Sequence, residues 1–132
     1  MSAEQGLKRW HSVVENGNRR DELSAIIRED AVFHSPVVHT PQQGRGLVVA
    51  YLAAAGQTLG NDSFKYIREV VDGENAMLEF TTEMDGVHVN GVDIIRFDEN
   101  GMISDFKVMV RPLKAMNKVW EQMAAMLETM KS

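Results

Sequence analysis

The second half of the chain is divided into segments of similar length by three dipeptides, Asp72-Gly73, Asp85-Gly86 and Asn100-Gly101. Between and around them, residues 63–72, 75–84, 87–97 and 102–111 alternate apolar and polar side chains with a period of two. Asp-Gly and Asn-Gly accept the positive φ angles that tight hairpin turns require. The four segments are therefore predicted to form an antiparallel meander, in which each strand pairs with the next one along the chain.

Helical periodicity precedes the meander. Apolar residues spaced three or four apart predict a first helix that ends at Gly17. Asn18 is a favourable N-cap for a second helix, which we expect to extend to about Asp30. A short β-prone stretch, residues 31–34, follows it and is broken by a proline. A third helix is expected over residues 48–59, after a loop rich in proline and glycine.

Pro112 suits the first position of a last helix. One side of this helix is expected to carry an apolar stripe made of Leu113, Met116, Trp120, Met123, Leu127 and Met130. Methionine adapts to irregular surfaces, so the stripe could pack in the core, cover a pocket or contact a partner. The predicted order is α-α-β-α-β-β-β-β-α, an α+β fold. With no internal repeat or linker, residues 1–132 are interpreted as a single domain.

Composition excludes several classes of function. The chain has 14 basic and 19 acidic residues and a net charge of −5, which disfavours nucleic-acid binding. It has no cysteine, so disulfides and thiolate chemistry are excluded. No apolar run approaches the length of a membrane span, and the N-terminus lacks the apolar core of a signal peptide. We expect a cytoplasmic protein without membrane contact, metal or cofactor.

The predicted order, the run of residues 30–36 (DAVFHSP) and the run of residues 91–103 (GVDIIRFDENGMI) together resemble the nuclear-transport-factor-2-like superfamily. The nearest look-alikes are SnoaL-like proteins and ketosteroid isomerases, over about residues 5–112. The resemblance implies a cystatin-like α+β cone, in which helices pack on the concave face of a curved antiparallel sheet around an apolar pocket. This architecture hosts enzymes and non-catalytic binders alike.

The resemblance also assigns candidate roles to three residues. Asp93 matches the protonated aspartic acid with which the isomerases donate a hydrogen bond to a developing oxyanion. Ser35 stands where the isomerases have their catalytic base, and a serine hydroxyl cannot shuttle protons at neutral pH. Trp10 stands where they have a second, tyrosine donor. Because two of the three positions differ, the sequence argues against ketosteroid isomerisation itself.

Strand parity places Asp93 in an apolar row that also contains Val89, Gly91, Ile95 and Phe97. Burial raises the pKa of a carboxyl group, so Asp93 is the candidate catalytic residue and proton donor. SnoaL-type polyketide cyclases, which the chain resembles, are thought to need one such acid in an apolar pocket. The alternative is a purely structural aspartate, hydrogen-bonded to Trp10, a backbone N–H or water.

The same parity and the resemblance predict which residues face an apolar small molecule. This candidate ligand-binding set consists of Trp10, Ser35, His39, Tyr51, Phe80, Phe97, Phe106, Val108 and Val110. His34 should face the other way. Ile94, Arg96 and Met109 lie on the opposite sheet face, through which related proteins commonly pair, so a homodimer is expected.

Two functional hypotheses remain open. One is an acid/base isomerase or cyclase that acts on an apolar carbonyl compound through Asp93. The other is a non-catalytic ligand-binding or dimerisation module of the same fold.

Overall fold

The computed structural model describes the backbone of residues 2–131 and the side chains of residues 3–125 and 128. This part of the chain forms an α+β fold of four helices and six strands. In chain order the elements are α1 (Ser2–Glu15), α2 (Arg20–Ile26), β1 (Ile27–His34), β2 (Gln42–Gln43), α3 (Arg45–Leu59), β3 (Lys65–Asp72), β4 (Asn75–Met84), β5 (Val87–Phe97), β6 (Ile103–Arg111) and α4 (Leu113–Lys131).

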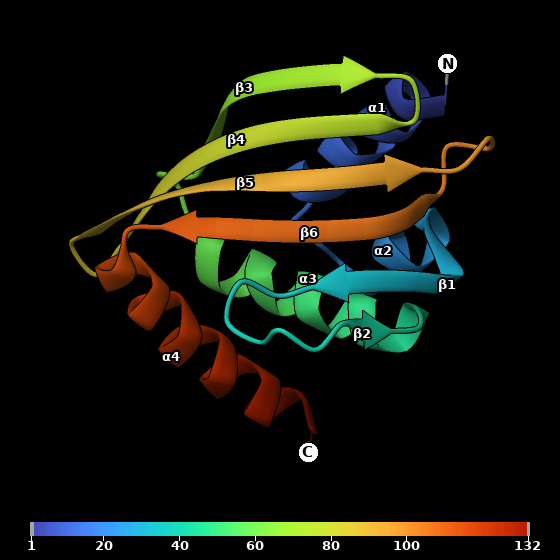
Figure 1. Cartoon of the computed structure of the whole chain (residues 1–132). Helices are drawn as coiled ribbons and strands as arrows, with labels where there is room; N and C mark the ends of the chain where they lie inside the picture. The colour runs from blue at the N-terminus through green and yellow to red at the C-terminus, as the bar shows by residue number, and fades with distance from the viewer. Residues whose placement is uncertain (1, 132) are drawn as a thin grey trace.

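The strands form one curved, unclosed sheet in the order β2-β1-β6-β5-β4-β3 (Figure 1). Its larger part is the predicted antiparallel meander of β3 to β6. The turns have the expected geometry, with positive φ angles at Gly73, Asp85, Gly86 and Gly101. The fold class is therefore confirmed, and the local turn chemistry accounts for the meander.

The sheet is mixed, whereas the sequence predicted an antiparallel one. β1 runs parallel to β6, pairing Phe33 with Phe106, and the two-residue strand β2 adds an edge that the sequence did not indicate. β1 also begins at Ile27, so the prediction that the second helix extends to about Asp30 is wrong. Pairing of Ile27 with Ile103 on β6 draws this segment into the sheet, and such a long-range pairing overrides helical propensity.

Asn18 does not cap the second helix as predicted. It adopts a positive φ of 56° in the turn between α1 and α2, and the N-cap position of α2 belongs to Arg19. The Asn18 side chain instead donates a hydrogen bond of 2.8 Å to the carbonyl oxygen of Leu52 on α3. The turn is thereby fixed to α3, and the Asn18 side chain fills the space that a side chain at Gly56 would occupy, since a Cβ there would lie 2.6 Å from Asn18 Cβ.

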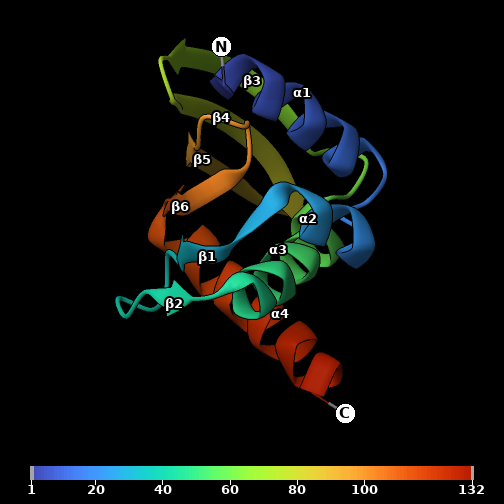
Figure 2. The same ribbon diagram turned by 90° about the vertical axis from the view of Figure 1, so that its right-hand side faces the viewer.

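Helices α1 and α3 lie on the concave side of the sheet, and α2 connects α1 to β1 (Figure 2). The core is formed where these helices meet the inward side chains of β4, β5 and β6. Its largest fully buried side chains include Phe80, Phe97 and Phe106. The sheet bends around this core, with register shifts next to Tyr66 in β3 and between Arg96 and Phe97 in β5.

Helix α4 buries a face that overlaps the predicted stripe only in part, since Met123 is the one predicted member that is buried among the described side chains. Ala115, Val119 and Met123 are its buried residues among the described side chains, whereas Leu113 and Trp120 are 76% and 49% exposed. Ala115 of α4 and Ala54 of α3 belong to the same buried cluster. Because their side chains are small, the two helices can approach each other closely. The predicted stripe members Leu127 and Met130 lie outside the described side chains.

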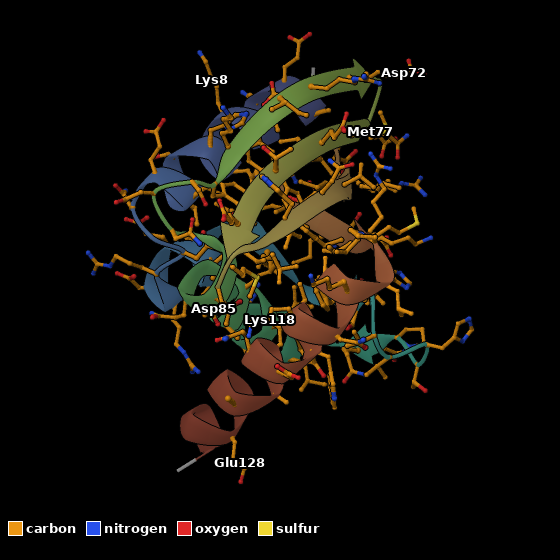
Figure 3. The ribbon with its side chains drawn as sticks, turned by 90° about the vertical axis from the view of Figure 1, so that its left-hand side faces the viewer. Lys8, Asp72, Met77, Asp85, Lys118 and Glu128 are labelled. Carbon is orange, nitrogen blue, oxygen red and sulfur yellow. The ribbon has the colours of Figure 1, made fainter. Side chains whose placement is uncertain are left out.

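An ion pair holds α4 to the turn between β4 and β5. Lys118 Nζ lies 3.0 Å from Asp85 Oδ2, and Figure 3 labels the two residues side by side next to the helix. Gln122, one turn further on, donates to the same carboxylate oxygen at 3.4 Å. None of the described helices has the length and apolar character needed to cross a membrane.

Candidate functional site

A cavity opens between the concave sheet face and the helices. The centres of water molecules could occupy about 90 Å³ of it. Side chains from α1, α3, α4 and five of the strands contribute to its walls, which are predominantly apolar. The described lining residues are Trp10, Val14, Gly17, Asn18, Phe33, Ser35, Pro36, Val37, Tyr51, Leu52, Ala55, Gly56, Leu59, Gly60, Phe64, Tyr66, Phe80, Asp93, Phe106, Val108, Val110, Val119, Trp120 and Met123.

Asp93 is the single carboxylate among these lining residues. It lies in the middle of β5, between Leu78 on β4 and Val108 on β6, and only 6% of its surface is exposed. Loss of hydration on burial raises the pKa of Asp93 from 3.8 to about 7, although a hydrogen bond from Tyr66 acts in the opposite direction. At neutral pH the carboxyl group is therefore present in both its protonated and its ionised form.

Tyr66 on β3 is the side-chain partner of Asp93 within the described part of the chain. Its hydroxyl donates a hydrogen bond of 2.7 Å to Asp93 Oδ2. Burial and the neighbouring negative charge raise the pKa of Tyr66 well above its ordinary value, so the phenol remains protonated. A buried, permanently protonated donor thus holds one carboxylate oxygen, and among the described side chains the other oxygen has no hydrogen-bond partner.

Trp10 joins this arrangement indirectly. Its indole Nε1 donates a 3.0 Å hydrogen bond to the Tyr66 hydroxyl oxygen, whereas the sequence had suggested Asp93 as its acceptor. Trp10 also packs on Phe106, with ring centroids 5.0 Å apart. The resulting chain of hydrogen bonds runs from Trp10 to Tyr66 and from Tyr66 to Asp93, and fixes the orientation of the carboxyl group.

Sequence reasoning missed Tyr66. The residue lies on the edge strand β3, beside the register shift between Tyr66 and Arg68 that interrupts the strand's alternation. The available signal was its parity with Phe64, since both aromatic rings face inward and contact each other with centroids 5.1 Å apart. A hydroxyl on an inward-facing aromatic residue of a strand is a candidate partner for a buried carboxylate.

Most of the predicted ligand-binding set lines the cavity: Trp10, Ser35, Tyr51, Phe80, Phe106, Val108 and Val110. Two predicted members do not. Phe97 faces inward but packs against Gly6 of α1 near the far end of β5, in the solid core. His39 is exposed in the loop between β1 and β2, where no strand pairing turns it toward the cavity.

Ser35 and His34 take opposite sides of the sheet, as predicted. Ser35 lines the cavity, and its Oγ accepts a hydrogen bond of 3.2 Å from the backbone N–H of Val37. His34 lies 2.8 Å from Asp105 on β6 and does not line the cavity. The residue at the isomerase base position therefore faces the cavity but carries no ionisable group.

Metal binding finds no support among the described side chains, since they contain no cluster of three or more histidine, aspartate and glutamate residues of the required geometry. The imidazole of His11 on α1 contacts the carboxylate of Glu69 on β3. The polar groups that face the cavity are suited to hydrogen bonding and proton transfer.

Comparison with known proteins agrees with this geometry. The SnoaL-like domain family matches residues 7–106. A steroid delta-isomerase from Pseudomonas aeruginosa is 33% identical, with a TM-score of 0.90 over 97% of this chain and 93% of that one. An uncharacterised bacterial protein with a cystatin-like fold, from Silicibacter pomeroyi, is 31% identical, with a TM-score of 0.83 over 91% and 83% of the two chains.

A protein from Jannaschia, provisionally named a SnoaL-like polyketide cyclase, shares the fold at 14% identity, with a TM-score of 0.70 over 89% and 92% of the two chains. None of the curated proteins gives a significant match. The family match covers most of the chain and includes Asp93 and most of the residues that line the cavity. The chain belongs to the SnoaL-like domain family, within the nuclear-transport-factor-2-like fold.

Proposed function

We propose that the cavity binds a small, apolar carbonyl compound and that Asp93 transfers a proton at the carbon next to its carbonyl group. The observation that carries this proposal is a single carboxyl group, 6% exposed, in an apolar cavity, with its pKa raised to about 7. An acid/base group is most effective when its pKa lies near the working pH. Asp93 meets that condition, and Tyr66 holds it in one orientation.

The reaction needs two proton transfers. Ionised Asp93 removes a proton from the carbon, the C–H bond breaks, and its electron pair moves onto the carbonyl oxygen to give an enolate. In an isomerisation, protonated Asp93 then returns the proton to a different carbon of the same molecule. In a cyclisation, the enolate carbon attacks a second carbonyl group of the molecule, and the new alkoxide takes the proton from Asp93.

The cavity residues favour this one-carboxylate scheme. Ser35 cannot supply a second acid/base group, and no other carboxylate is among the described lining residues. The 33% identity to a steroid delta-isomerase supports a carbonyl-bearing ligand, and the shared fold with a provisionally named polyketide cyclase is compatible with the same proton chemistry. By the resemblance, ketosteroid isomerases combine a catalytic base with a protonated aspartic acid. This chain differs from them because Ser35 stands at the position of the base.

A second function, ligand binding without turnover, is favoured by the presence of Ser35 at the isomerase base position. In that case protonated Asp93 donates a hydrogen bond to the ligand's carbonyl oxygen and no C–H bond breaks. Tyr66 would serve only to orient the donor. The two functions share the cavity and differ in whether a proton reaches carbon.

A turnover assay distinguishes them. Thermal-shift screening with cyclic ketones and β-diketones identifies binders, and a β,γ-unsaturated cyclohexenone then reports isomerisation through the ultraviolet absorbance of its conjugated product. We expect turnover by the wild type, its loss in Asp93→Asn, and no change in the control Asp72→Asn, whose exposed carboxylate lies at the tip of β3 (Figure 3). Binding of ketones without turnover by the wild type would support the non-catalytic function.

A further inference from the structure

A shallow apolar groove continues the cavity toward the surface. It lies between the segment after β1 and the first turns of α4, and its described lining consists of Pro36, Val37, Leu113, Met116, Asn117 and Trp120. Pro36, Val37 and Trp120 also line the cavity, so the two spaces meet at these residues. No ionisable side chain is among the six, and Asn117 is the one polar member.

The groove leaves large apolar side chains exposed. Leu113 is 76% exposed and Trp120 is 49% exposed, although both lie on the helix whose other face packs on α3. Exposed apolar groups that adjoin one another at a cavity mouth are typical of ligand or protein contact sites. The question is therefore which occupant covers them.

The sizes of the two spaces favour an extended ligand. Water centres could occupy about 90 Å³ in the cavity and about 390 Å³ in the groove. Sites for drug-sized ligands typically measure about 300–1,000 Å³, so the cavity by itself accommodates only part of such a molecule. A second copy of the chain is a poorer occupant, because a stable protein interface involves about 20–30 residues on each side and this groove has far fewer.

We propose that the groove is a subsite for the unbranched apolar tail of the ligand whose carbonyl-bearing head occupies the cavity. The inference rests on the proposed function, because the head must reach Asp93. The preferred ligand is then an amphiphile with a compact head and an uncharged alkyl or acyl chain. Trp120 contacts the ligand at the junction of cavity and groove, and Leu113 contacts the distal part of its chain.

Alkyl phenyl ketones test this proposal, because the head stays constant from acetophenone to decanophenone while the chain lengthens. Full burial of a methylene group strengthens binding about fourfold, and burial on one side in an open groove by about twofold. Dissociation constants from isothermal titration calorimetry should therefore fall two- to fourfold per methylene once the chain reaches the groove.

The groove variant is Leu113→Asp, and its matched control is Leu47→Asp. Both leucines are exposed residues in the first turn of a helix, where an acidic side chain favours the helix dipole, and Leu47 lines neither space. Leu113→Asp should weaken decanophenone binding about tenfold or more, as several methylenes lose apolar contact, while acetophenone binding stays within about twofold. Leu47→Asp should reproduce the wild-type series.

Three results would overturn the proposal, and they are distinguishable. Wild-type binding of acetophenone with no gain for longer ketones would refute the groove subsite and leave the cavity function intact. Absence of binding for every ketone would refute the cavity function as well. If Leu113→Asp left the ketone series unchanged but lowered the mass in light scattering, the groove would be a contact between copies of this chain.

Discussion

Replacing Asp93 with asparagine removes one ionisation from the interior and nearly preserves the side-chain shape. In the folded protein the pKa of Asp93 is raised to about 7, against about 3.9 for an aspartate in an unfolded chain. Because the folded state binds the proton more tightly, the protonated carboxyl stabilises the protein fully below pH 4. This stabilisation is lost as the pH rises through about 7. Each pKa unit corresponds to about 1.4 kcal/mol, so the total loss is about 4 kcal/mol.

Urea denaturation of both proteins between pH 5 and pH 8 measures this effect. At pH 5 the free energy of unfolding still contains about 3 kcal/mol from protonated Asp93, and at pH 8 nearly none. Asparagine does not titrate, so its stability relative to the wild type should rise by nearly 3 kcal/mol from pH 5 to pH 8. Titration of the surface groups cancels, since both proteins carry them.

The result that would refute the reasoning is a difference in unfolding free energy that stays constant within about 0.5 kcal/mol over this pH range, with unchanged m-values. The carboxyl group would then titrate at the same pH in the folded and unfolded states, which means that water hydrates it in the folded protein. In that case Asp93 would remain ionised at neutral pH and could not act as a proton donor.

Three further changes test other parts of the structure. Tyr66→Phe removes the hydrogen bond that lowers the pKa of Asp93, so carbon-13 NMR titration of that carboxyl should give a still higher pKa; an unchanged or lower value would contradict the geometry. Gly91→Ala places a methyl group 2.3 Å from Phe80 Cζ and should cost about 1–3 kcal/mol in chemical denaturation, whereas wild-type stability would show that the ring can move aside. We propose that two copies of the chain pair through the outer sheet face, where the apolar residue Met109 is 49% exposed. Light scattering should then give a dimer mass for the wild type and a monomer mass for Met109→Lys. A wild-type monomer at micromolar concentration would disprove this.

Local chemistry allowed the sequence to predict the meander. The Asp-Gly and Asn-Gly dipeptides specify tight turns, and a turn between adjacent strands fixes their pairing and register. The register in turn fixes which side chains share a face, which is why Asp93 could be placed inward among apolar neighbours. By contrast, the helical segment predicted up to Asp30 becomes strand from Ile27 onward, because β6, more than 70 residues away, pairs with it in parallel.

Periodicity was a poorer guide to the faces of α4. Of the large apolar residues at helical spacing, α4 buries Met123 but exposes Leu113 and Trp120, and it also buries the smaller Ala115 and Val119. An amphipathic pattern identifies a helix without specifying which apolar residues face the core, since small side chains allow the closest approach to a neighbouring helix. The exposed residues that result belong to the groove for which a ligand tail is proposed.

What the sequence determined by itself was the fold class, the order of most elements and the inward position of Asp93, because turn chemistry and alternation act between residues close in the chain. What only the tertiary structure decided was the environment of that carboxyl group. Tyr66, Trp10 and Asp93 come from β3, α1 and β5, and no local pattern relates them. The pKa of Asp93 depends on the water that these packed elements exclude and on the one hydrogen bond they supply, and both exist only once the chain has folded.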